Sequence, residues 1–318
     1  MEFYDIFNGD ADGLCALQQL RLTEPRQATL VTGVKRDIGL LARVRPAPGD
    51  VVTVLDISLA RNAAAATAAL AAGASITWFD HHSPGEIPQH PEFVSHIDTD
   101  AAVCTSLLVD RHLSGAQRAW AITGAFGDNL GAVAQSLAES SGYGRDDTDV
   151  LRRLGQCLNY NAYGTRVPEL LFDPGQLSLR MRAYRDPLVF AREDDAMATL
   201  EAAMEDDMAK ALAVAPHSAA EGVAVIVLPD EPWSHRVSGT LAHALARKAP
   251  ERAHAVLTPL DGCYTVSIRA PLTSPRGAAD VAARFQGGGR AGAAGIDRLP
   301  PDAVEAFEAA MREVYGPR

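Results

Sequence analysis

The sequence predicts an α/β protein with two α/β domains joined by helices. Short apolar runs alternate with helical stretches through the first half, which indicates a largely parallel sheet with crossover helices. From about residue 145 to 215 the pattern becomes mainly helical, and a second alternation of strands and helices starts at Val223. We therefore expect an N-terminal domain over 1–165, a helical connector over 166–219 and a smaller C-terminal α/β domain over 220–318.

Apolar, β-branched and aromatic runs predict five strands in the first half, with helical stretches between them. The expected strands are 3–7, 29–32, 51–55, 76–79 and 93–97. The expected helices run through Leu14 to Leu20, over 61–72, through Leu107 and Leu108, and over 119–126. Several of the strands end on an ionisable side chain, at the carboxyl edge where open α/β sheets bind ligands.

The second half is expected to begin with helices that are broken at three prolines, Pro168, Pro174 and Pro187. The acidic, amphipathic stretch 201–212 should be a helix that connects the domains. The C-terminal domain should then have strands at 223–228, 253–257 and 264–268 and helices at 237–247, 278–285 and 301–314. The last two helices flank the glycine-rich run 286–295, which would let backbone amides approach an anion closely.

The composition is typical of a globular protein. Apolar residues make up 47% of the 318, and the Ala-rich run 63–72 is too short to span a bilayer. The chain start lacks the pattern of a signal peptide and the four cysteines are far apart, so we expect reduced thiols and a cytoplasmic location. The net charge of -11 argues against a protein that holds long nucleic acid by bulk electrostatics, but permits a small phosphorylated substrate. Basic charge is almost all arginine, and the lysines are Lys35, Lys210 and Lys248.

Acidic and imidazole side chains gather at the predicted strand ends. Asp10 and Asp12 lie two residues apart in a glycine-punctuated turn after the first strand. Their charges repel each other and a bound cation is the usual compensation, whereas helix N-capping would account for only one of them. Asp56 and the triplet Asp80-His81-His82 end later strands, and Asp128 follows an apolar helix and a glycine. Taken singly, the triplet is also compatible with a polar strand end that faces water, and Asp128 with a helix C-cap and turn.

Together these side chains predict a metal site in the N-terminal half. Oxygen-rich ligation with one or two imidazoles suits Mn²⁺ or Mg²⁺ better than zinc. A carboxylate that bridges two such ions is the usual arrangement for the hydrolysis of phosphate esters. The pattern therefore indicates phosphoester chemistry.

The order of these motifs resembles that of the DHH phosphoesterases, in the branch that carries a C-terminal DHHA1 domain (oligoribonuclease and RecJ-like proteins). The four motifs of the family would be Gly9–Gly13, Leu55-Asp56, Asp80-His81-His82 and Gly127-Asp128. The run 287–295 looks like the DHHA1 signature. The resemblance spans nearly the whole chain and is weakest across the middle helices.

The resemblance implies a two-ion site with Mn²⁺ or Mg²⁺. The first ion would be held by Asp10 and Asp56. The second would be held by Asp12, Asp56, His81 and Asp128. Asp80 would orient His81, and His82 would act on the transferred phosphate as a hydrogen-bond donor or proton source.

The resemblance also implies that the DHHA1 domain binds the substrate's other phosphate or its nucleotide. The residues that match are Arg269, Gly287, Gly288, Gly289 and Arg290. We therefore expect glycine amides and guanidinium groups to act together in substrate binding.

Two positions depart from the family's pattern. The first motif usually opens with a metal-binding histidine, and this chain has Asn8 there. An amide oxygen is a poorer ligand for Mn²⁺ than imidazole, so we expect a weakened first metal site with Asn8 at most a weak ligand. The DHHA1 signature usually has a histidine after its three glycines, and this chain has Arg290, which can also bind phosphate.

These observations predict a hydrolase that cleaves a small nucleotide-type phosphodiester or phosphomonoester with metal-activated water. The substrate would be a short single-stranded oligonucleotide, a cyclic dinucleotide or a bisphosphorylated nucleoside, and no membrane partner is expected. Two alternatives stay open: a nucleotide-binding regulatory protein with a decayed metal site, and a pyrophosphatase or polyphosphatase. The oligomeric state, a homodimer included, is also open.

Overall fold

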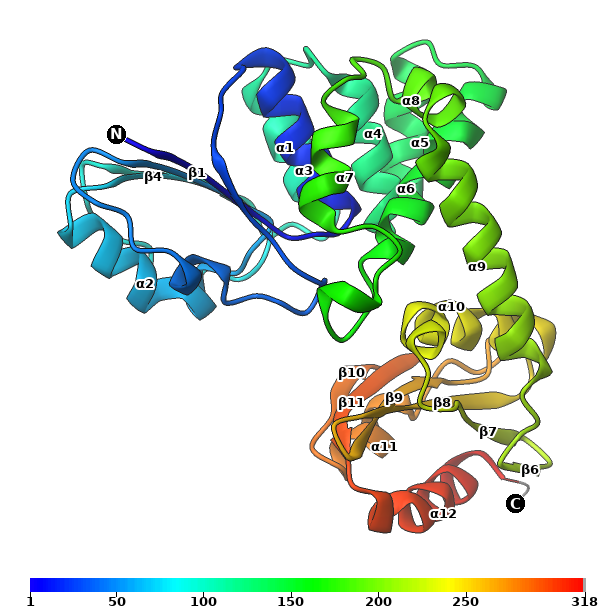
Figure 1. Ribbon diagram of the computed structural model, residues 1–318. Helices are drawn as coiled ribbons and strands as arrows, with labels where there is room; N and C mark the ends of the chain where they lie inside the picture. Colours follow the sequence, from blue (N-terminus) through cyan, green and yellow to red (C-terminus); the bar gives the residue numbers. More distant parts are fainter. Residues whose placement is uncertain (317–318) are drawn as a thin grey trace. The chain divides into compact units, whose positions relative to one another are not determined.

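The computed structural model describes residues 1–316, and the chain divides after Glu201 into two compact units (Figure 1). The division falls within helix α9 (Asp195–Ala213). The domain boundaries expected at 165 and 219 stay predictions.

The first unit is built on a five-stranded parallel sheet with the strand order β2-β1-β3-β4-β5. The strands are β1 (Phe3–Phe7), β2 (Thr29–Val31), β3 (Val51–Leu55), β4 (Ser75–Asp80) and β5 (Phe93–Ile97). This confirms the parallel sheet that the sequence predicts. The chain moves from β1 outward to β2 and then crosses to β3, so the order reverses between β1 and β3. Open sheets bind ligands at the carboxyl side of such a switch point.

Side chains alternate in direction along each strand, and other elements of the unit cover both faces of the sheet. One face packs against α2 (Leu59–Ala71) and the short helix η1 (Leu40–Arg43), and its buried residues include Ile6, Val54 and Trp78. The other face packs against helices of the same unit, and its largest residues are Phe7, Leu55 and Phe79. Figure 1 shows α2 on one side of the strands and α1, α3 and α4 on the other.

Seven further helices complete the first unit: α1 (Ala11–Thr23), α3 (Thr105–His112), α4 (Arg118–Gly127), α5 (Gly131–Ser140), α6 (Arg145–Asn161), α7 (Pro174–Met181) and α8 (Pro187–Glu193). Pro174 and Pro187 begin helices rather than break them, because the first helical position needs no backbone N–H donor. Pro168 lies in the short helix η2 (Val167–Glu169).

Glycines allow α1, α4 and α6 to pack closely where the acidic motifs lie. A Cβ atom on Gly127 would stand 2.3 Å from the Cβ of Ala11 and 2.7 Å from the carbonyl oxygen of Gly155. Real Cβ atoms do not come this close to other atoms. The absence of a side chain at Gly127 therefore keeps the following residue, Asp128, beside the start of α1.

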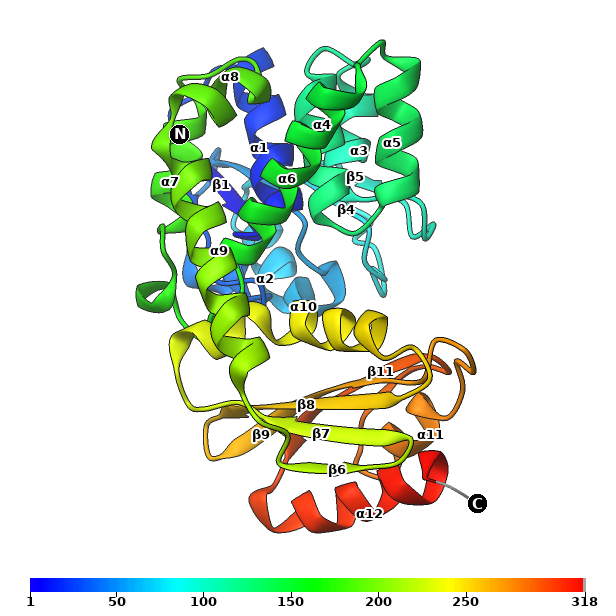
Figure 2. The ribbon, with the colours of Figure 1, turned by 90° about the vertical axis from the view of Figure 1, so that its right-hand side faces the viewer.

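The second unit has a mixed six-stranded sheet with the order β10-β11-β9-β8-β7-β6. Its strands are β6 (Ser218–Ala220), β7 (Val223–Val227), β8 (Ala253–Leu260), β9 (Cys263–Arg269), β10 (Gly288–Arg290) and β11 (Ala293–Leu299). Helix α10 (Pro232–Lys248) covers one face, and α11 (Ala278–Ala283) and α12 (Val304–Tyr315) cover the other (Figure 2). A third short helix, η3 (Pro301–Ala303), precedes α12.

The glycine-rich run differs from the open loop that its composition suggests. Strands β10 and β11 form an antiparallel pair in which Gly288 lies opposite Gly295 and Arg290 opposite Ala293. Small residues let the two backbones and α11 come close, since a Cβ atom on Gly287 would stand 2.3 Å from the carbonyl oxygen of Gly295. Among residues 1–316, no helix is both long and apolar enough to cross a membrane.

Candidate metal centre

The carboxyl ends of β1, β3 and β4 meet at one edge of the first sheet and carry the predicted motifs. The hydrogen-bond ladder continues one residue beyond the strands, from the Asn8 N–H to the Leu55 carbonyl (3.2 Å) and from the Asp56 N–H to the Phe79 carbonyl (3.0 Å). The motifs that follow β1, β3 and β4 are distant in the sequence but lie side by side at this edge of the sheet. The edge includes the switch point between β1 and β3.

Asp56 lies at the centre of this edge in a strained backbone conformation. Its φ of +58° is in the left-handed region that side chains other than glycine, asparagine and aspartate rarely adopt. The carboxylate is buried and accepts a hydrogen bond from the Thr105 hydroxyl at 3.1 Å. Burial, followed by the charges of Asp10 and Asp12, raises the pKa of Asp56 well above its ordinary value. A cation beside Asp56 would reverse this shift.

Asp12 is fixed by the beginning of α3. Its carboxylate accepts hydrogen bonds from the backbone N–H groups of Thr105 and Ser106, both at 2.7 Å, and from the Ser106 hydroxyl at 2.5 Å. Free N–H groups and the positive end of the helix dipole favour an anion at this position. Sequence reasoning missed both Thr105 and Ser106, which carry no motif of their own.

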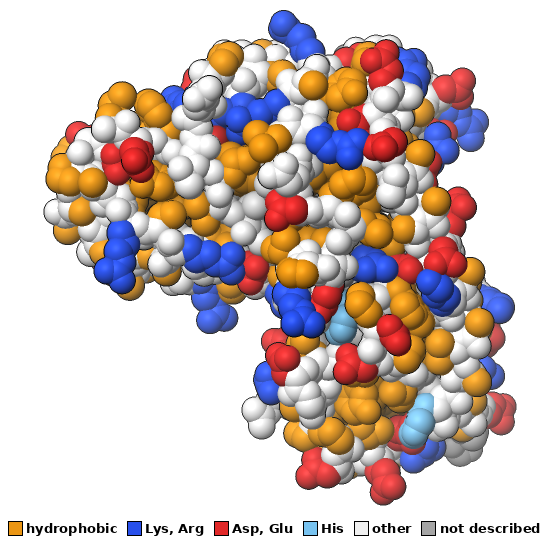
Figure 3. All heavy atoms as spheres, in the orientation of Figure 1, with side chains coloured by type: hydrophobic (Ala, Val, Ile, Leu, Met, Phe, Trp, Pro, Cys, Tyr) orange, Lys and Arg blue, Asp and Glu red, His pale blue; other side chains and the backbone are white. Residues whose placement is uncertain are grey.

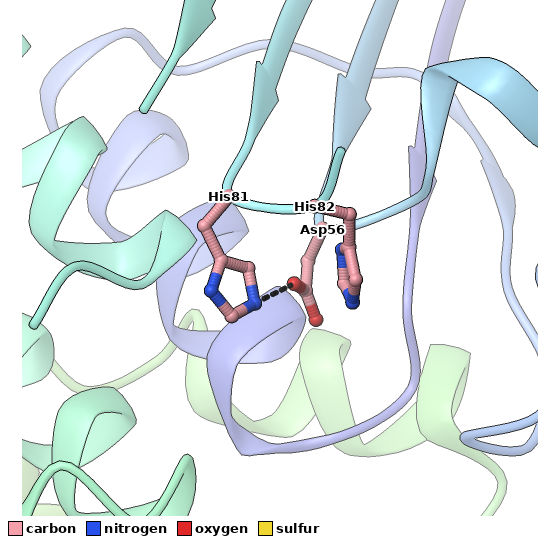
Figure 4. A group of neighbouring side chains, drawn as sticks. All are labelled: Asp56, His81 and His82. Carbon is pink, nitrogen blue, oxygen red and sulfur yellow. Dashed lines mark ion pairs between the residues drawn. The ribbon is translucent and has the colours of Figure 1, made fainter. Parts of the chain in front are cut away.

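His81 presents its Nε2 atom to the carboxylates. Its Nδ1 lies 3.0 Å from the Val103 carbonyl oxygen, which accepts a hydrogen bond only from a protonated Nδ1, so Nε2 keeps its lone pair in the neutral ring. Nε2 lies 3.4 Å from the Asp56 carboxylate (Figure 4) and 3.9 Å from the Asp128 carboxylate. Val103, rather than the expected Asp80, therefore orients this ring.

Asp128 follows the last residue of α4, and Asn129 after it turns the chain in the left-handed region with φ +63°. Burial, followed by the charges of Asp12 and Asp10, raises the pKa of Asp128 to about 7. Protons or a metal ion would relieve the same repulsion.

Two overlapping groups of side chains at this edge have metal-ligand spacing. The ligand atoms of Asp12, His81 and Asp128 lie within 4.8 Å of one another, and so do those of Asp56, His81 and His82. Carboxylate oxygens with imidazole nitrogen are ligands that suit Mn²⁺ and Mg²⁺. Each of the two groups therefore has donors that suit such an ion.

Asp80 is paired with His82. The His82 Nδ1 lies 2.7 Å from the Asp80 carboxylate, whose same oxygen accepts the backbone N–H of His81 at 2.9 Å. Asp80 is fully buried, whereas about half of the His82 side chain (48%) is exposed. The hydrogen bond to Asp80 raises the pKa of His82. Figure 4 shows the His82 ring beside the Asp56 side chain.

Asp10 has a different environment, because it forms an ion pair with the Lys35 ammonium. Burial alone would raise the pKa of Asp10, but Lys35 and the Gly13 N–H outweigh it and hold that pKa below its ordinary value. Asn8 is buried and uses both ends of its amide in hydrogen bonds: Oδ1 accepts the Asp10 N–H at 3.2 Å, and Nδ2 donates to the Lys35 carbonyl at 3.1 Å. The donors expected for a first metal ion therefore do not fit one here. The sequence offered one signal for Lys35: lysine is rare in this chain, whose basic residues are almost all arginines.

In the second unit, the structure places the two candidate arginines on one face of the sheet. Arg290 pairs with Ala293, and Ala293 pairs with Arg269, so the two arginines occupy one row across three strands. Arg269 lies 3.0 Å from the His243 ring through Nη2, and its Nε has no hydrogen-bond partner among the described residues. Burial lowers the pKa of Arg269. Arg290 is exposed, as are Gly288 and Gly289.

Solved structures that share this fold include manganese-bound exonucleases and a phosphodiesterase. RecJ from Thermus thermophilus, in complex with Mn²⁺, aligns with a TM-score of 0.60 and 19% identity over 98% of this chain and 52% of RecJ. A further exonuclease RecJ bound to manganese aligns with a TM-score of 0.58 and 17% identity, over 98% of this chain and 89% of that one. The pGpG-specific phosphodiesterase PggH from Vibrio cholerae aligns with a TM-score of 0.56 and 14% identity, over 99% of both chains. No protein-family profile and no curated protein matches the sequence.

The lengths of these proteins differ. This chain spans about half the length of the Thermus RecJ and almost the whole length of PggH. Both are members of the DHH superfamily. The chain therefore shares the fold of RecJ and PggH, which is the fold that its sequence motifs indicate.

Proposed function

We propose that this chain is a metal-dependent phosphoesterase that hydrolyses a small nucleotide-type phosphodiester or phosphomonoester. The observation that carries the proposal is the convergence of the His81 Nε2 with the carboxylates of Asp56 and Asp128 at the switch point of a parallel sheet. The high pKa values of Asp56 and Asp128 indicate a site whose negative charge needs a cation.

One Mn²⁺ or Mg²⁺ ion would be held by Asp12, Asp56, His81 and Asp128. Such an ion supplies a water of lowered pKa and polarises a phosphoryl oxygen. The hydrogen bonds that Thr105 and Ser106 donate to Asp12, and the one that the Val103 carbonyl accepts from His81, would keep these side chains oriented before the ion binds.

His82 would act as the proton donor to the leaving oxygen. Its Nδ1 is held by the buried Asp80 carboxylate, which fixes the ring and favours its protonated form. The exposed part of the ring would face the substrate. Asp80 would thereby act through His82.

The substrate would be a small nucleotide rather than long nucleic acid. The chain carries a net charge of -11, and acidic and basic side chains are interspersed on the face drawn in Figure 3. Arg269 and Arg290, with the amides of Gly288 and Gly289, would bind the second phosphate or the nucleotide, because an arginine without a carboxylate partner is free to pair with an anion. The Gly287 amide, which the sequence also suggested, is already used, since it donates to the Ala282 carbonyl at 2.9 Å. PggH, the neighbour matched over its whole length, acts on the dinucleotide pGpG.

The proposal is tested by incubating the full chain with Mn²⁺ and a substrate panel. The panel contains pGpG, a cyclic dinucleotide, a bisphosphorylated nucleoside, a short single-stranded oligonucleotide and polyphosphate. We expect hydrolysis of at least one nucleotide, no hydrolysis in excess chelator, and loss of hydrolysis in His81→Asn. His90→Asn, at an exposed histidine, is the matched control and should retain activity.

Other outcomes would favour the alternatives. Nucleotide binding without hydrolysis of any panel member would indicate a regulatory protein, for which the ion pair of Asp10 with Lys35 is the specific observation. Hydrolysis of polyphosphate alone would indicate a polyphosphatase. Full activity in His81→Asn would show that the candidate metal centre is not the catalytic site.

A further inference from the structure

A lysine side chain enters the acidic edge of the first sheet where a metal ion would be expected. The Lys35 ammonium forms an ion pair with the Asp10 carboxylate, lies 3.2 Å from the Asn159 side-chain oxygen and stands 5.5 Å from the centre of the Tyr163 ring. Its backbone is also tied down, since the Lys35 N–H donates to the Ala162 carbonyl at 2.9 Å. The side chain is mostly buried, with 29% exposed. Both the side chain and the backbone of Lys35 are therefore held in place beside Asp10.

Both oxygens of the Asp10 carboxylate have partners, and unlike those of Asp12 one of these partners is a cation. One carboxylate oxygen accepts the N–H groups of Asp12 and Gly13, both at 3.1 Å, and caps α1. The other oxygen pairs with Lys35. Asp10 also belongs to neither group of clustered ligands, whereas Asp12, Asp56 and Asp128, the other aspartates expected to hold metal, each belong to one.

Asn8 and Lys35 form one structural unit. The Asn8 amide donates to the Lys35 carbonyl and accepts from the Asp10 N–H, so it links the lysine loop to the first motif. A histidine in this position would present a ring nitrogen that cannot make both contacts in the same way. The Asn8 side chain therefore holds the Lys35 segment against the first motif.

We propose that the Lys35 ammonium replaces the first divalent cation, so that the site binds one Mn²⁺ ion and not two. This rests on the proposed metal-dependent function and specifies how its site is built. The ammonium neutralises Asp10, and it would repel a divalent cation placed against the same carboxylate. An ammonium has three donors, and Asp10 and Asn159 take two of them. The third would bind a substrate phosphate oxygen in place of the missing ion.

The experiment measures how many Mn²⁺ ions the full chain binds. Metal-stripped protein is equilibrated with excess Mn²⁺ and separated from free ion, and the bound manganese is counted by mass spectrometry and examined by EPR. We expect one Mn²⁺ per wild-type chain with the spectrum of an isolated ion. Asn8→His combined with Lys35→Ala should bind two and give the spectrum of a magnetically coupled pair.

Lys210→Ala is the matched control, because Lys210 is a half-exposed lysine that is also paired with an aspartate, Asp206. It should bind one Mn²⁺. Two ions in the wild-type chain would overturn the proposal for Lys35 but leave the metal-dependent function intact. No bound ion would overturn both. One ion in the folded double variant would show that Lys35 does not exclude the second, and if that variant fails to fold, the wild-type count decides.

Discussion

Asp56 combines a left-handed backbone with a buried carboxylate, and the two properties can be separated by substitution. Asp56→Asn keeps a residue that tolerates φ +58°, whereas Asp56→Ala places an ordinary side chain there at a cost of about 1–2 kcal/mol. Both variants lose a proposed metal ligand. Since even the partners of metal ligands are worth about 10–100-fold, we expect kcat/KM to fall by more than about 100-fold in each.

The stability of the two variants should differ in the metal-free state. Both variants remove a carboxylate that burial and neighbouring charges destabilise, but only Asp56→Ala also places an ordinary side chain at φ +58°, so the Tm of Asp56→Asn at neutral pH should exceed that of Asp56→Ala. Thermal unfolding followed by circular dichroism measures this. Activity within tenfold of wild type in Asp56→Asn at saturating Mn²⁺ would exclude Asp56 as a ligand.

Asp128 should make the metal-free protein less stable as the pH rises. Its pKa is raised from 3.8 to about 7 by folding, so the folded state binds more protons than the unfolded state between these values. The stability contributed by the protonated form is complete below the unfolded pKa and is lost as the pH rises to about 7. We therefore expect the Tm advantage of Asp128→Asn over wild type to be larger at about pH 8 than at about pH 5.

The comparison is made with chelator present, by thermal unfolding at both pH values. Asp302→Asn, at an exposed carboxylate, should give a much smaller change between them. An advantage of Asp128→Asn that shrinks toward pH 8 would contradict the raised pKa.

Arg269 and Arg290 are proposed to bind substrate, so their loss should weaken binding and leave the bond-breaking step intact. One charge-assisted contact is worth about 1.5–3 kcal/mol, which corresponds to a rise in KM of about 10-fold to 100-fold in Arg269→Ala or Arg290→Ala. Arg298→Ala, at an exposed arginine of β11, is the matched control. A fall in kcat at unchanged KM would place these residues in the chemical step instead.

At the scale of elements, the contact of α1 with α4 and α6 places Asp128 beside the first motif. Gly127→Ala would put a Cβ atom 2.3 Å from Ala11, so the helices must move apart, and overpacking of this kind destabilises by about 1–3 kcal/mol. We expect a lower free energy of unfolding in denaturant and weaker Mn²⁺ binding. Gly131→Ala, with open space around its Cβ, should change stability by less than about 0.5 kcal/mol. Equal effects of the two substitutions would contradict the close-packing account.

The elements themselves show where sequence patterns are informative. Five predicted strands and their parallel arrangement were confirmed, because buried strands leave continuous apolar runs. Strands β6, β10 and β11 were missed, the first two because three polar or small residues carry no period. Pro174 and Pro187 were predicted to break helices, but they begin helices. Whether a proline breaks or begins a helix depends on where the chain before it turns.

At the scale of the whole molecule, the two units have separate hydrophobic cores. Mn²⁺ bound to the first unit should therefore stabilise that unit selectively. At a free concentration 100 times Kd the stabilisation is about 2.7 kcal/mol. Hydrogen exchange should slow in β1, β3, β4 and the beginnings of α1 and α3, while β7, β8 and β9 exchange at an unchanged rate. Equal slowing in both units would show that they unfold together.

The sequence by itself determined the parallel sheet, the ionisable residues at its strand ends and the class of chemistry they can support. These follow from local periodicity and from side-chain chemistry, which nearby residues specify. Only the tertiary structure decided which groups touch them. Lys35 reaches Asp10 across 25 positions, and the N–H groups that hold Asp12 are 93 and 94 positions away. Such contacts depend on the path of loops and on helix packing, which no local pattern encodes, and they decide whether a carboxylate faces a metal ion or a lysine.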